Sequence, residues 1–295
     1  MNYSEKYGYA PDREAIGRAI DMIAANMENI ASEQVYKDCF SMMDLTTLKT
    51  DDTPASVTKL VEKVNSFHNI FPEWPYPASI CVFSNFASTV KEARKGDYNI
   101  TVVSACFPSS QSFLEVKLKE VEMAVEQGAD EVDIVLALNA FLAGDYEAAA
   151  EEIRQVRKCI DAVAQKQNRH VHLKVILETG LLRTPEAIAN ASFLAMEAGA
   201  DFIKTSTGKV DVNATPAAAY VMCECIAKYQ ESTGKKIGFK PAGGISTAAD
   251  ALCYYSIVST VLGKEWLNKD LFRFGVSRVA NSLLAAVEQV TVSYF

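Results

Sequence analysis

Short apolar segments alternate with amphipathic segments along most of this chain, and this alternation limits its fold more than any other feature. Each apolar segment has the length and composition of a buried β-strand, and each amphipathic segment repeats its apolar residues at helical spacing. Parallel strands need a crossover helix between them, so the pattern predicts repeated β-α units. The predicted strands are residues 40–45, 79–83, 100–105, 131–137, 171–178, 202–205, 237–241 and 273–275.

Eight strands of this kind, each followed by a helical segment, close naturally into a (β/α)8 barrel. The predicted helices include residues 54–67, 113–127, 145–164, 185–198 and 216–228. An open, doubly wound sheet is the competing arrangement, but no Gly-x-Gly-x-x-Gly sequence opens a helix after the first strand. The motif Glu-x-Gly-Ala-Asp leads into two of the strands, ending at Asp130 and at Asp201, as a structural repeat would. We therefore expect an α/β fold of the TIM-barrel type.

The first part of the chain lies outside this alternation. After Pro11-Asp12, apolar residues recur at intervals of three or four, which predicts a helix. These residues are Ile16, Ile20, Ile23, Met27 and Ile30. We predict an N-terminal helical extension over residues 1–34 and one barrel domain over residues 35–295. The extension either covers one end of the core or contacts another subunit of a homo-oligomer, and the sequence favours neither.

The composition excludes several classes of function. The chain has 295 residues and a formal net charge of −8, which argues against nucleic-acid and anionic-membrane partners. No apolar run approaches the roughly 20 residues that cross a bilayer. Seven cysteines without framework spacing indicate reduced thiols and a cytoplasmic location. His170 and His172 alternate at strand spacing, but no further clustered ligand accompanies them, so we expect no metal site.

Two apolar runs end in a lysine, which is unusual because lysine is among the residues least often buried. Lys204 precedes the sequence Thr-Ser-Thr-Gly-Lys, and Lys240 precedes Pro-Ala-Gly-Gly. Either lysine can keep its stem in the core and its ammonium in solvent. Alternatively, burial and a second cation lower a lysine pKa, and the neutral amine then attacks a carbonyl to form a Schiff base. Two lysines at equivalent ends of neighbouring strands favour the second interpretation.

In a barrel of this type the active site lies at the carboxyl ends of the strands. The polar residues that the sequence places there are Asp44, Cys81, Asp133, Lys174, Glu178, Lys204 and Lys240. Asp133 stands inside an apolar strand and needs a partner, so we interpret it as a structural ion-pair residue, a general acid/base or both. Lys174 is interpreted as part of a charge network, and Cys81 as a small apolar wall rather than a nucleophile.

Glycine-rich turns after the last two strands predict a phosphate site. Gly243-Gly244 follows the seventh strand, and Gly275-Val276-Ser277 follows the eighth and leads into a helix. Backbone N–H groups in glycine loops and at helix starts bind phosphate, and loops after strands seven and eight often do so in barrels. A glycine pair alone indicates only a turn, but its place in the repeat points to phosphate.

Several longer motifs, in order, resemble those of the deoxyribose-phosphate aldolase family, which are class I aldolases with a (β/α)8 barrel. The resemblance extends from about residue 35 to about residue 287. The motifs are Met43-Asp44-Leu45-Thr46-Thr47-Leu48, Ala129-Asp130-Glu131-Val132-Asp133, Leu173-Lys174-Val175-Ile176-Leu177-Glu178-Thr179-Gly180, Phe202-Ile203-Lys204-Thr205-Ser206-Thr207-Gly208-Lys209, Asn213-Ala214-Thr215-Pro216, Gly238-Phe239-Lys240-Pro241-Ala242-Gly243-Gly244 and Arg273-Phe274-Gly275.

The resemblance implies reversible cleavage of 2-deoxyribose 5-phosphate to glyceraldehyde 3-phosphate and acetaldehyde. It implies that Lys204 forms the Schiff base, that Lys240 keeps its amine reactive, and that Asp133 shuttles protons with an ordered water. The iminium supplies the electron sink, so no metal and no cofactor are expected. The phosphate would be held by Thr207, Gly208, Lys209, Gly243, Gly244 and Ser277, and the candidate substrate-binding residues also include Asp44, Cys81 and Arg278.

The chain departs from the family pattern in its phosphate loops, at its C-terminus and in its long N-terminal extension. Ser246 stands where an arginine often follows the glycine pair, and Arg278 stands where a second serine often follows Ser277. We hypothesise that Arg278 supplies the missing charge, the alternative being an exposed arginine that points to solvent. The chain ends on Phe295 rather than on a tyrosine, so a lid role for Tyr294 stays open.

Two other functions fit parts of the pattern. A different Schiff-base barrel aldolase, acting on a keto-acid or sugar phosphate, would need the same lysines. A phosphate-sugar-binding barrel without catalysis would keep the glycine loops but would have no use for Lys204, Lys240 and Asp133 together. This set of three residues favours an aldolase.

Overall fold

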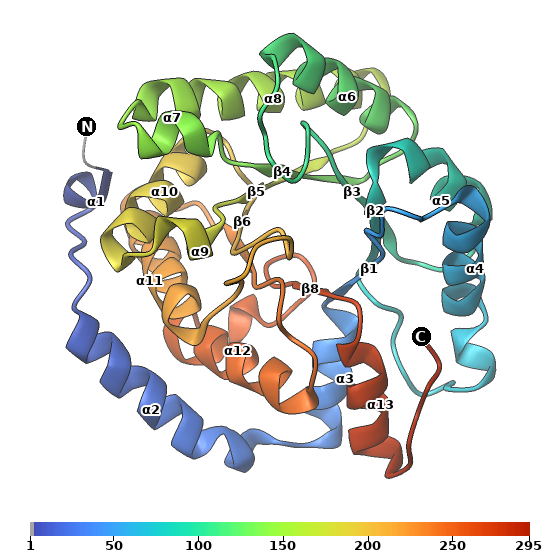
Figure 1. Ribbon diagram of the computed structural model, residues 1–295. Helices are drawn as coiled ribbons and strands as arrows, with labels where there is room; N and C mark the ends of the chain where they lie inside the picture. Colours follow the sequence, from blue (N-terminus) through green and yellow to red (C-terminus); the bar gives the residue numbers. More distant parts are fainter. Residues whose placement is uncertain (1–2) are drawn as a thin grey trace.

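The computed structural model describes residues 3–295, and over this range eight parallel strands form a barrel with helices around it (Figure 1). The strands are β1 (Met43–Thr46), β2 (Ser79–Phe83), β3 (Asn99–Val103), β4 (Glu131–Val135), β5 (His172–Ile176), β6 (Phe202–Lys204), β7 (Gly238–Lys240) and β8 (Phe274–Val276). The α/β barrel expected from the alternation is confirmed.

Hydrogen bonding between the strands closes the ring. Neighbouring strands pair in sequence order from β1 to β7, and β1 also pairs with β8. Two isolated bridges, Phe239 with Phe272 and Ala242 with Gly275, join the segments of β7 and β8. The register places Lys204 opposite Lys240, and Asp133 opposite Lys174. Inward and outward side chains alternate along the strands of a barrel, so these four residues share its interior.

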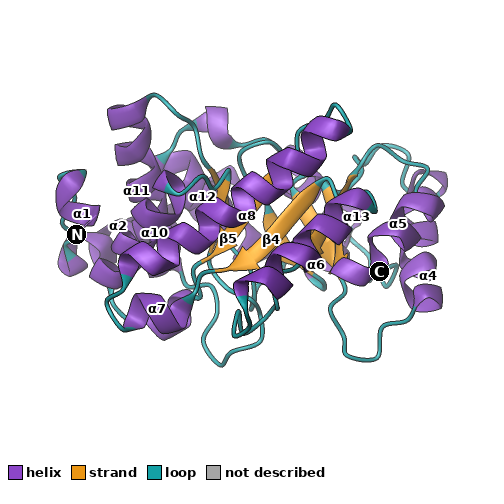
Figure 2. Ribbon diagram, turned by 90° about the horizontal axis from the view of Figure 1, so that it is seen from above, coloured by secondary structure: helices purple, strands orange, loops and turns teal. Residues whose placement is uncertain are grey.

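Helices form a layer around the outside of the barrel, and Figure 2 shows them flanking the strands. They are α4 (Pro54–Asn65), α5 (Ala87–Ala93), α6 (Leu114–Glu126), α8 (Tyr146–Lys166), α10 (Pro185–Glu197), α11 (Pro216–Thr233), α12 (Ala248–Val261) and α13 (Val279–Glu288), with the short segments η1 (Phe67–Asn69), η2 (Ser84–Phe86), α7 (Leu138–Leu142), α9 (Thr179–Leu182) and η3 (Lys264–Trp266) between elements. Three of the helices begin with Thr-Pro, in which the threonine side chain caps the helix and the proline occupies its first turn. These threonines are Thr53, Thr184 and Thr215.

Three helices precede the first strand: α1 (Tyr3–Lys6), α2 (Arg13–Ile30) and α3 (Glu33–Ser41). The Asp12 side chain caps α2, where the sequence predicts a helix start. α1 and α2 run along the outside of α10, α11 and α12 (Figure 1). Tyr7 stacks on Phe193 of α10 with ring centroids 4.5 Å apart. Residues 1 and 2 of the predicted extension lie outside the described residues, and its predicted boundary at residue 34 falls within α3.

The predicted start of the first strand is wrong. Phe40 belongs to α3, and β1 begins only at Met43. Phe40 is fully buried and stacks on Phe67 at 5.0 Å, so a buried helix end and a strand merge into one apolar run in the sequence. A short apolar run does not distinguish these two structures.

The barrel interior is rich in charge, whereas helices and strands meet through apolar side chains. Seven buried ionisable residues project into it, which we call the charge cluster: Asp44, Glu131, Asp133, Lys174, Lys204, Lys240 and Arg273. Burying so many charges is costly unless they are paired, so their contacts deserve a functional explanation. Among the described helices, none is long and apolar enough to cross a membrane.

Candidate active site

A cavity of about 500 Å³ lies at the carboxyl ends of the strands, with walls from the loops after β1, β6, β7 and β8. Lys204, the last residue of β6, reaches this cavity although it is only 4% exposed. All seven residues predicted for the phosphate loops line the same cavity: Thr207, Gly208, Lys209, Gly243, Gly244, Ser277 and Arg278. The fold therefore brings the predicted binding loops to the predicted nucleophile.

Lys204 and Lys240 differ in their carboxylate contacts. The Nζ atoms of both lysines lie 2.8 Å from the same oxygen, Asp133 Oδ2. Lys240 also pairs with Asp44 Oδ2, through a charge contact that is not an aligned hydrogen bond. Within residues 3–295, Asp133 is the carboxylate with which Lys204 pairs. Lys240 thus pairs with two carboxylates, whereas Lys204, over the same range, pairs only with Asp133, which it shares with Lys240.

Asp133 lies at the centre of the cluster. Its Oδ1 accepts from Lys174 Nζ at 3.0 Å, which leaves Oδ2 facing Lys204 and Lys240. This carboxylate is fully buried and contacts three lysines. The contacts fix the direction of each oxygen, and they place one of them beside the amine that reaches the cavity.

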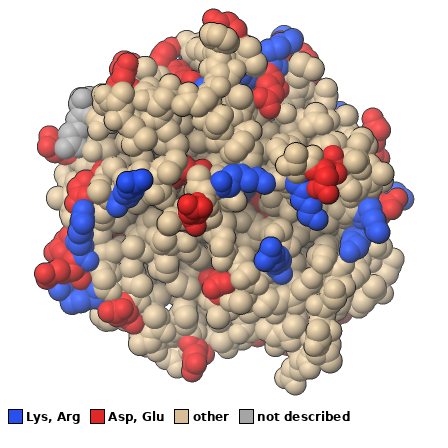
Figure 3. Space-filling model, viewed as in Figure 1, with Lys and Arg blue, Asp and Glu red and all other residues tan. Residues whose placement is uncertain are grey.

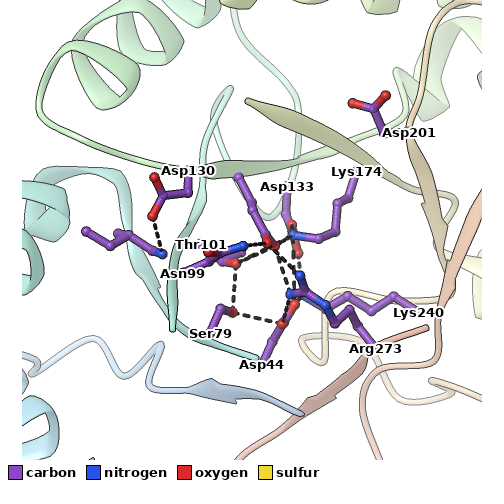
Figure 4. Close-up of polar contacts among 12 residues, drawn as sticks. Asp44, Ser79, Asn99, Thr101, Asp130, Asp133, Lys174, Asp201, Lys240 and Arg273 are labelled. Carbon is purple, nitrogen blue, oxygen red and sulfur yellow. Dashed lines mark hydrogen bonds and ion pairs between the residues drawn. The ribbon is translucent and has the colours of Figure 1, made fainter. Parts of the chain in front are cut away.

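A second layer of charges lies toward the amino ends of the strands, around Glu131 at the start of β4. Arg273 donates to both oxygens of Glu131, at 2.7 and 3.0 Å, and Arg273 Nη1 also lies 2.6 Å from Asp44 Oδ1. Lys174 pairs with Glu131 as well as with Asp133, so it joins the two layers. Figure 4 shows Asp44, Lys174 and Arg273 converging on one point inside the barrel.

Hydroxyl groups complete the second layer. Ser79 Oγ donates to Asp44 Oδ1 at 2.8 Å, and Thr101 Oγ1 donates to Glu131 Oε2 at 2.9 Å. Asn99 Nδ2 donates to the other oxygen of Glu131 at 2.6 Å. Buried carboxylates are stable when their oxygens are paired in this way.

The pKa values of Lys204 and Lys240 shift in opposite directions. Burial lowers the pKa of Lys204 and the Lys240 cation lowers it further, and together they outweigh Asp133. Burial acts against the charge of Lys240 too, but the Asp133 and Asp44 carboxylates outweigh it and raise the Lys240 pKa. Burial opposes the Asp133 charge, but Lys174, Lys204 and Lys240 hold its pKa well below the ordinary value. Lys204 is therefore the lysine that loses its proton first, beside a cation and a carboxylate.

The glycine turn after β7 has a left-handed backbone conformation. Gly243 and Gly244 have φ values of +82° and +81°, a region that other residues rarely adopt. A Cβ on Gly243 would also lie 2.7 Å from the Asn213 side chain. Ser277 and Arg278 stand immediately before α13, whose first backbone N–H groups have no side-chain cap.

Cations at the cavity come from loops other than the one after β7. The backbone N–H groups of Ser246 and Thr247 donate to Asp250 Oδ2, each at 2.9 Å, so the start of α12 is closed by its own side chain. Arg278 and Lys49 are exposed and line the cavity from the loops after β8 and β1. In the space-filling view, Lys and Arg side chains lie around the middle of this face of the barrel (Figure 3).

Two further contacts hold the loop after β6. Thr207 donates its backbone N–H and its hydroxyl to Glu178, at 3.1 and 2.6 Å. Lys209 Nζ donates to the carbonyl of Leu48 in the loop after β1, at 2.6 Å. Both lysine and carbonyl line the cavity, so this hydrogen bond crosses one side of it.

Among the predicted catalytic and substrate-binding residues, Lys240, Asp133, Asp44 and Cys81 do not line the cavity, and neither does Tyr294. Asp44 and Cys81 are fully buried within the barrel, and burial raises the pKa of the Cys81 thiol. The Tyr294 hydroxyl donates to Lys63 O at 2.7 Å, and its ring packs against Phe67. Tyr294, the penultimate residue, is therefore docked on α4.

Sequence reasoning missed three residues that the structure brings to the site: Glu131, Arg273 and Lys49. Glu131 carries the same signal as Asp133, since it is a carboxylate two positions earlier on the same face of the same strand. Arg273 precedes an apolar strand directly, as a charged residue that needs a partner. Lys49 has no comparable signal, because a lysine in a polar loop is ordinary. Over the described range, no group of three or more His, Cys, Asp or Glu side chains is arranged to hold a metal ion.

Comparisons with known proteins agree with this geometry. The DeoC/LacD family aldolase model matches residues 39–254. The deoxyribose-phosphate aldolase of Homo sapiens is 42% identical over 84% of this chain and 78% of its own length. The enzyme of that name from Agrobacterium fabrum is 40% identical, over 83% of this chain and 88% of its own length.

Solved structures show the same fold. The deoxyribose phosphate aldolase of Aeropyrum pernix, whose structure is described as tetrameric, superposes with a TM-score of 0.67 at 22% identity, over 95% of this chain and all of that one. An aldolase called QR15 gives the same TM-score at 26% identity, over 86% of this chain and 99% of that one. Because the family model spans most of the barrel and the identity to curated enzymes is high, the chain belongs to the DeoC/LacD family of aldolases.

Proposed function

We propose that the chain cleaves 2-deoxyribose 5-phosphate reversibly through a Schiff base on Lys204. Deoxyribose-phosphate aldolase activity follows from 42% and 40% identity to curated enzymes of that name. The choice of nucleophile rests on the second carboxylate that pairs with Lys240 but not with Lys204, although both lysines lie 2.8 Å from Asp133 Oδ2. Lys240 has a second carboxylate and stays cationic, whereas the Lys204 amine reaches the cavity with a lowered pKa.

The first step is attack of the neutral Lys204 amine on the C1 aldehyde of the open-chain sugar. The nitrogen lone pair forms the C–N bond, and loss of water from the carbinolamine gives an iminium. Lys240 stays cationic 2.8 Å from the shared Asp133 oxygen and can donate a proton toward the departing hydroxyl. The iminium then provides the electron sink for the next step.

Cleavage follows when a base removes the proton from the C3 hydroxyl. The O–H electrons form the carbonyl of glyceraldehyde 3-phosphate, the C2–C3 bond breaks, and its electrons pass into the iminium to give an enamine. Asp133 is an ionised, buried carboxylate beside the reacting nitrogen, so it serves as this base through an ordered water. Return of the proton to C2 and hydrolysis of the new iminium release acetaldehyde and restore Lys204.

The phosphate is held at the other side of the cavity. Gly243, Gly244 and Ser277 offer backbone N–H groups, while Lys209 and Arg278 offer charge. This places the sugar chain between the phosphate loops and the amine that attacks its aldehyde. The proposed partners are therefore a phosphorylated sugar and an aldehyde. Self-association and a cytoplasmic location stay predictions from the sequence.

The test is to treat the folded protein with acetaldehyde and borohydride and then to map the modified peptide by mass spectrometry. Reduction converts an iminium into a stable secondary amine, so Lys204 should gain an ethyl group. Lys204→Met should abolish that adduct, whereas Lys117→Met, which removes a buried lysine outside the charge cluster, should not. Labelling at Lys240 or Lys174 would reverse the assignment. An adduct with pyruvate but not with acetaldehyde would indicate a keto-acid aldolase instead.

A further inference from the structure

The charge cluster contains more cations than carboxylates. Its cations are Lys174, Lys204, Lys240 and Arg273, and its carboxylates are Asp44, Glu131 and Asp133. With every group ionised the cluster carries one net positive charge in a region that is almost closed to water. Burial penalises such an excess charge, so release of a single proton makes the cluster neutral.

The proton leaves the position with the fewest carboxylate contacts. Lys174 lies near three carboxylates and Lys240 pairs with two, while Lys204 shares a single oxygen. Arg273 does not lose a proton in proteins. The count of charges and the pattern of contacts therefore lead to the same residue, Lys204.

Glu131 and Arg273 lie toward the amino ends of the strands. They determine both the net charge of the cluster and which carboxylate oxygen faces each lysine. Arg273 occupies Asp44 Oδ1, so Oδ2 is the oxygen left for Lys240. Glu131 holds Lys174, which in turn holds Asp133 Oδ1 and turns Oδ2 toward Lys204. The Arg273 guanidinium also lies 5.8 Å from the centre of the Phe202 ring, a contact that helps to hold it at the amino-end side of the cluster.

We propose that Glu131 and Arg273 are positioning residues for the aldolase reaction, which set the charge count of the buried cluster so that Lys204 is its unprotonated amine. The inference rests on the proposed function, because it concerns the same nucleophile. Neither residue lines the cavity or reaches the reacting atoms. Their effect on the reaction passes through Asp44, Asp133 and Lys174.

The groups that act on Lys204 come from strands around the barrel. Asp133 on β4, Lys240 on β7 and the Cys81 thiol on β2 act on it directly. Lys174 on β5 acts through Asp133, and Asp44 on β1, paired with Arg273 beside β8, acts through Lys240. Removing Arg273 leaves the cluster neutral with all lysines charged, which favours the proton on Lys204. Removing the Glu131 charge does the opposite.

The experiment measures the initial rate of Lys204 ethylation by acetaldehyde and cyanoborohydride as a function of pH, peptide by peptide. Arg273→Gln should move the midpoint of this profile to higher pH by about one unit or more, a tenfold lower rate at neutral pH. Glu131→Gln should move the midpoint to lower pH. The double variant Glu131→Gln/Arg273→Gln restores one excess cation and should return the midpoint to the wild-type position.

Controls separate charge from packing. Arg273→Lys keeps the cation and loses the forked contact, so its midpoint should stay at the wild-type pH even if turnover falls. Glu152→Gln breaks the partly buried Lys117–Glu152 pair outside the barrel interior and should lower stability without moving the midpoint. Should Arg273→Gln fail to fold, Glu131→Gln still tests the proposal, since its shift has the opposite sign.

Unchanged midpoints in folded Arg273→Gln and Glu131→Gln would overturn the proposal, and so would a double variant that keeps the shift of Arg273→Gln. These outcomes leave the proposed function intact, because the wild-type protein would still form its adduct. Absence of any adduct on wild-type Lys204 would instead sink the Schiff-base mechanism itself.

Discussion

Lys204 and Lys240 compete for one oxygen atom, since the Nζ of each lies 2.8 Å from Asp133 Oδ2 and Lys240 also pairs with Asp44. The competition separates two residues of the same chemical type. In the proposed mechanism Lys240, which pairs with two carboxylates, remains a cation, and Lys204, whose charge has fewer carboxylate partners, becomes the nucleophile. Two equivalent strand ends thus acquire different roles through a carboxylate that they share.

Replacing Lys240 by Gln should move the acid limb of the kcat/KM profile to higher pH. In the proposed mechanism Lys204 reacts as the neutral amine, and burial together with the Lys240 cation lowers its pKa. Without that cation the Lys204 pKa rises, by about one unit or more, so activity appears only at higher pH. The measurement is kcat/KM between pH 5 and 10. A variant that is inactive at every pH would show that Lys240 acts only as a proton donor.

Asp133→Asn should lower both turnover and stability. The amide cannot accept the C3 hydroxyl proton, and loss of a general base costs about 10²- to 10⁴-fold in kcat. It also leaves Lys174, Lys204 and Lys240 short of a carboxylate, and breaking a buried pair costs about 3–5 kcal/mol of unfolding free energy. Turnover and denaturant unfolding measure the two effects. Near-normal activity in a destabilised variant would leave Asp133 with a structural role alone.

Arg278→Ala should weaken binding of the phosphorylated sugar specifically. A charge-assisted hydrogen bond to phosphate contributes about 1.5–3 kcal/mol, so KM for deoxyribose 5-phosphate should rise about 10- to 100-fold. The kcat/KM for unphosphorylated deoxyribose should stay nearly constant. Adding Ser246→Arg to this variant should recover part of the loss, because it returns a cation to the neighbouring loop. Equal losses on both substrates would point to a packing defect.

Tyr7→Ala should lower stability while sparing catalysis. Tyr7 stacks on Phe193 at 4.5 Å and lies 5.5 Å from Tyr229, so its loss should cost about 1–2 kcal/mol of unfolding free energy. No described residue of the proposed extension lines the cavity, so kcat/KM should not change. Met22→Ala, at a side chain that is 68% exposed, is the matched control. A parallel fall in kcat/KM would show that the extension supports the site.

The barrel was predictable because alternation and strand length are local properties of the sequence. The ends of helices and strands were less predictable. Phe40 belongs to α3 although the sequence predicts a strand at this position, because a buried helix end and a strand have the same composition. Lys204, Lys240 and Asp133 stood out as charges within apolar strands. The pairing of these residues could not be predicted. The carboxylate oxygen that faces each amine is set by Glu131 and Arg273, which lie more than 140 positions apart in the chain. Register brings such residues together only after the ring closes.

The Lys209–Leu48 hydrogen bond has a consequence for the timing of catalysis. It ties the loop after β6 to the loop after β1 through a neutral carbonyl, at 2.6 Å. A phosphate dianion is a stronger acceptor than a carbonyl, so we expect the ammonium to leave Leu48 when the substrate arrives. Binding of the substrate would then break the Lys209–Leu48 hydrogen bond in the same step. The dwell time of glyceraldehyde 3-phosphate will depend on how soon the carbonyl regains its lysine.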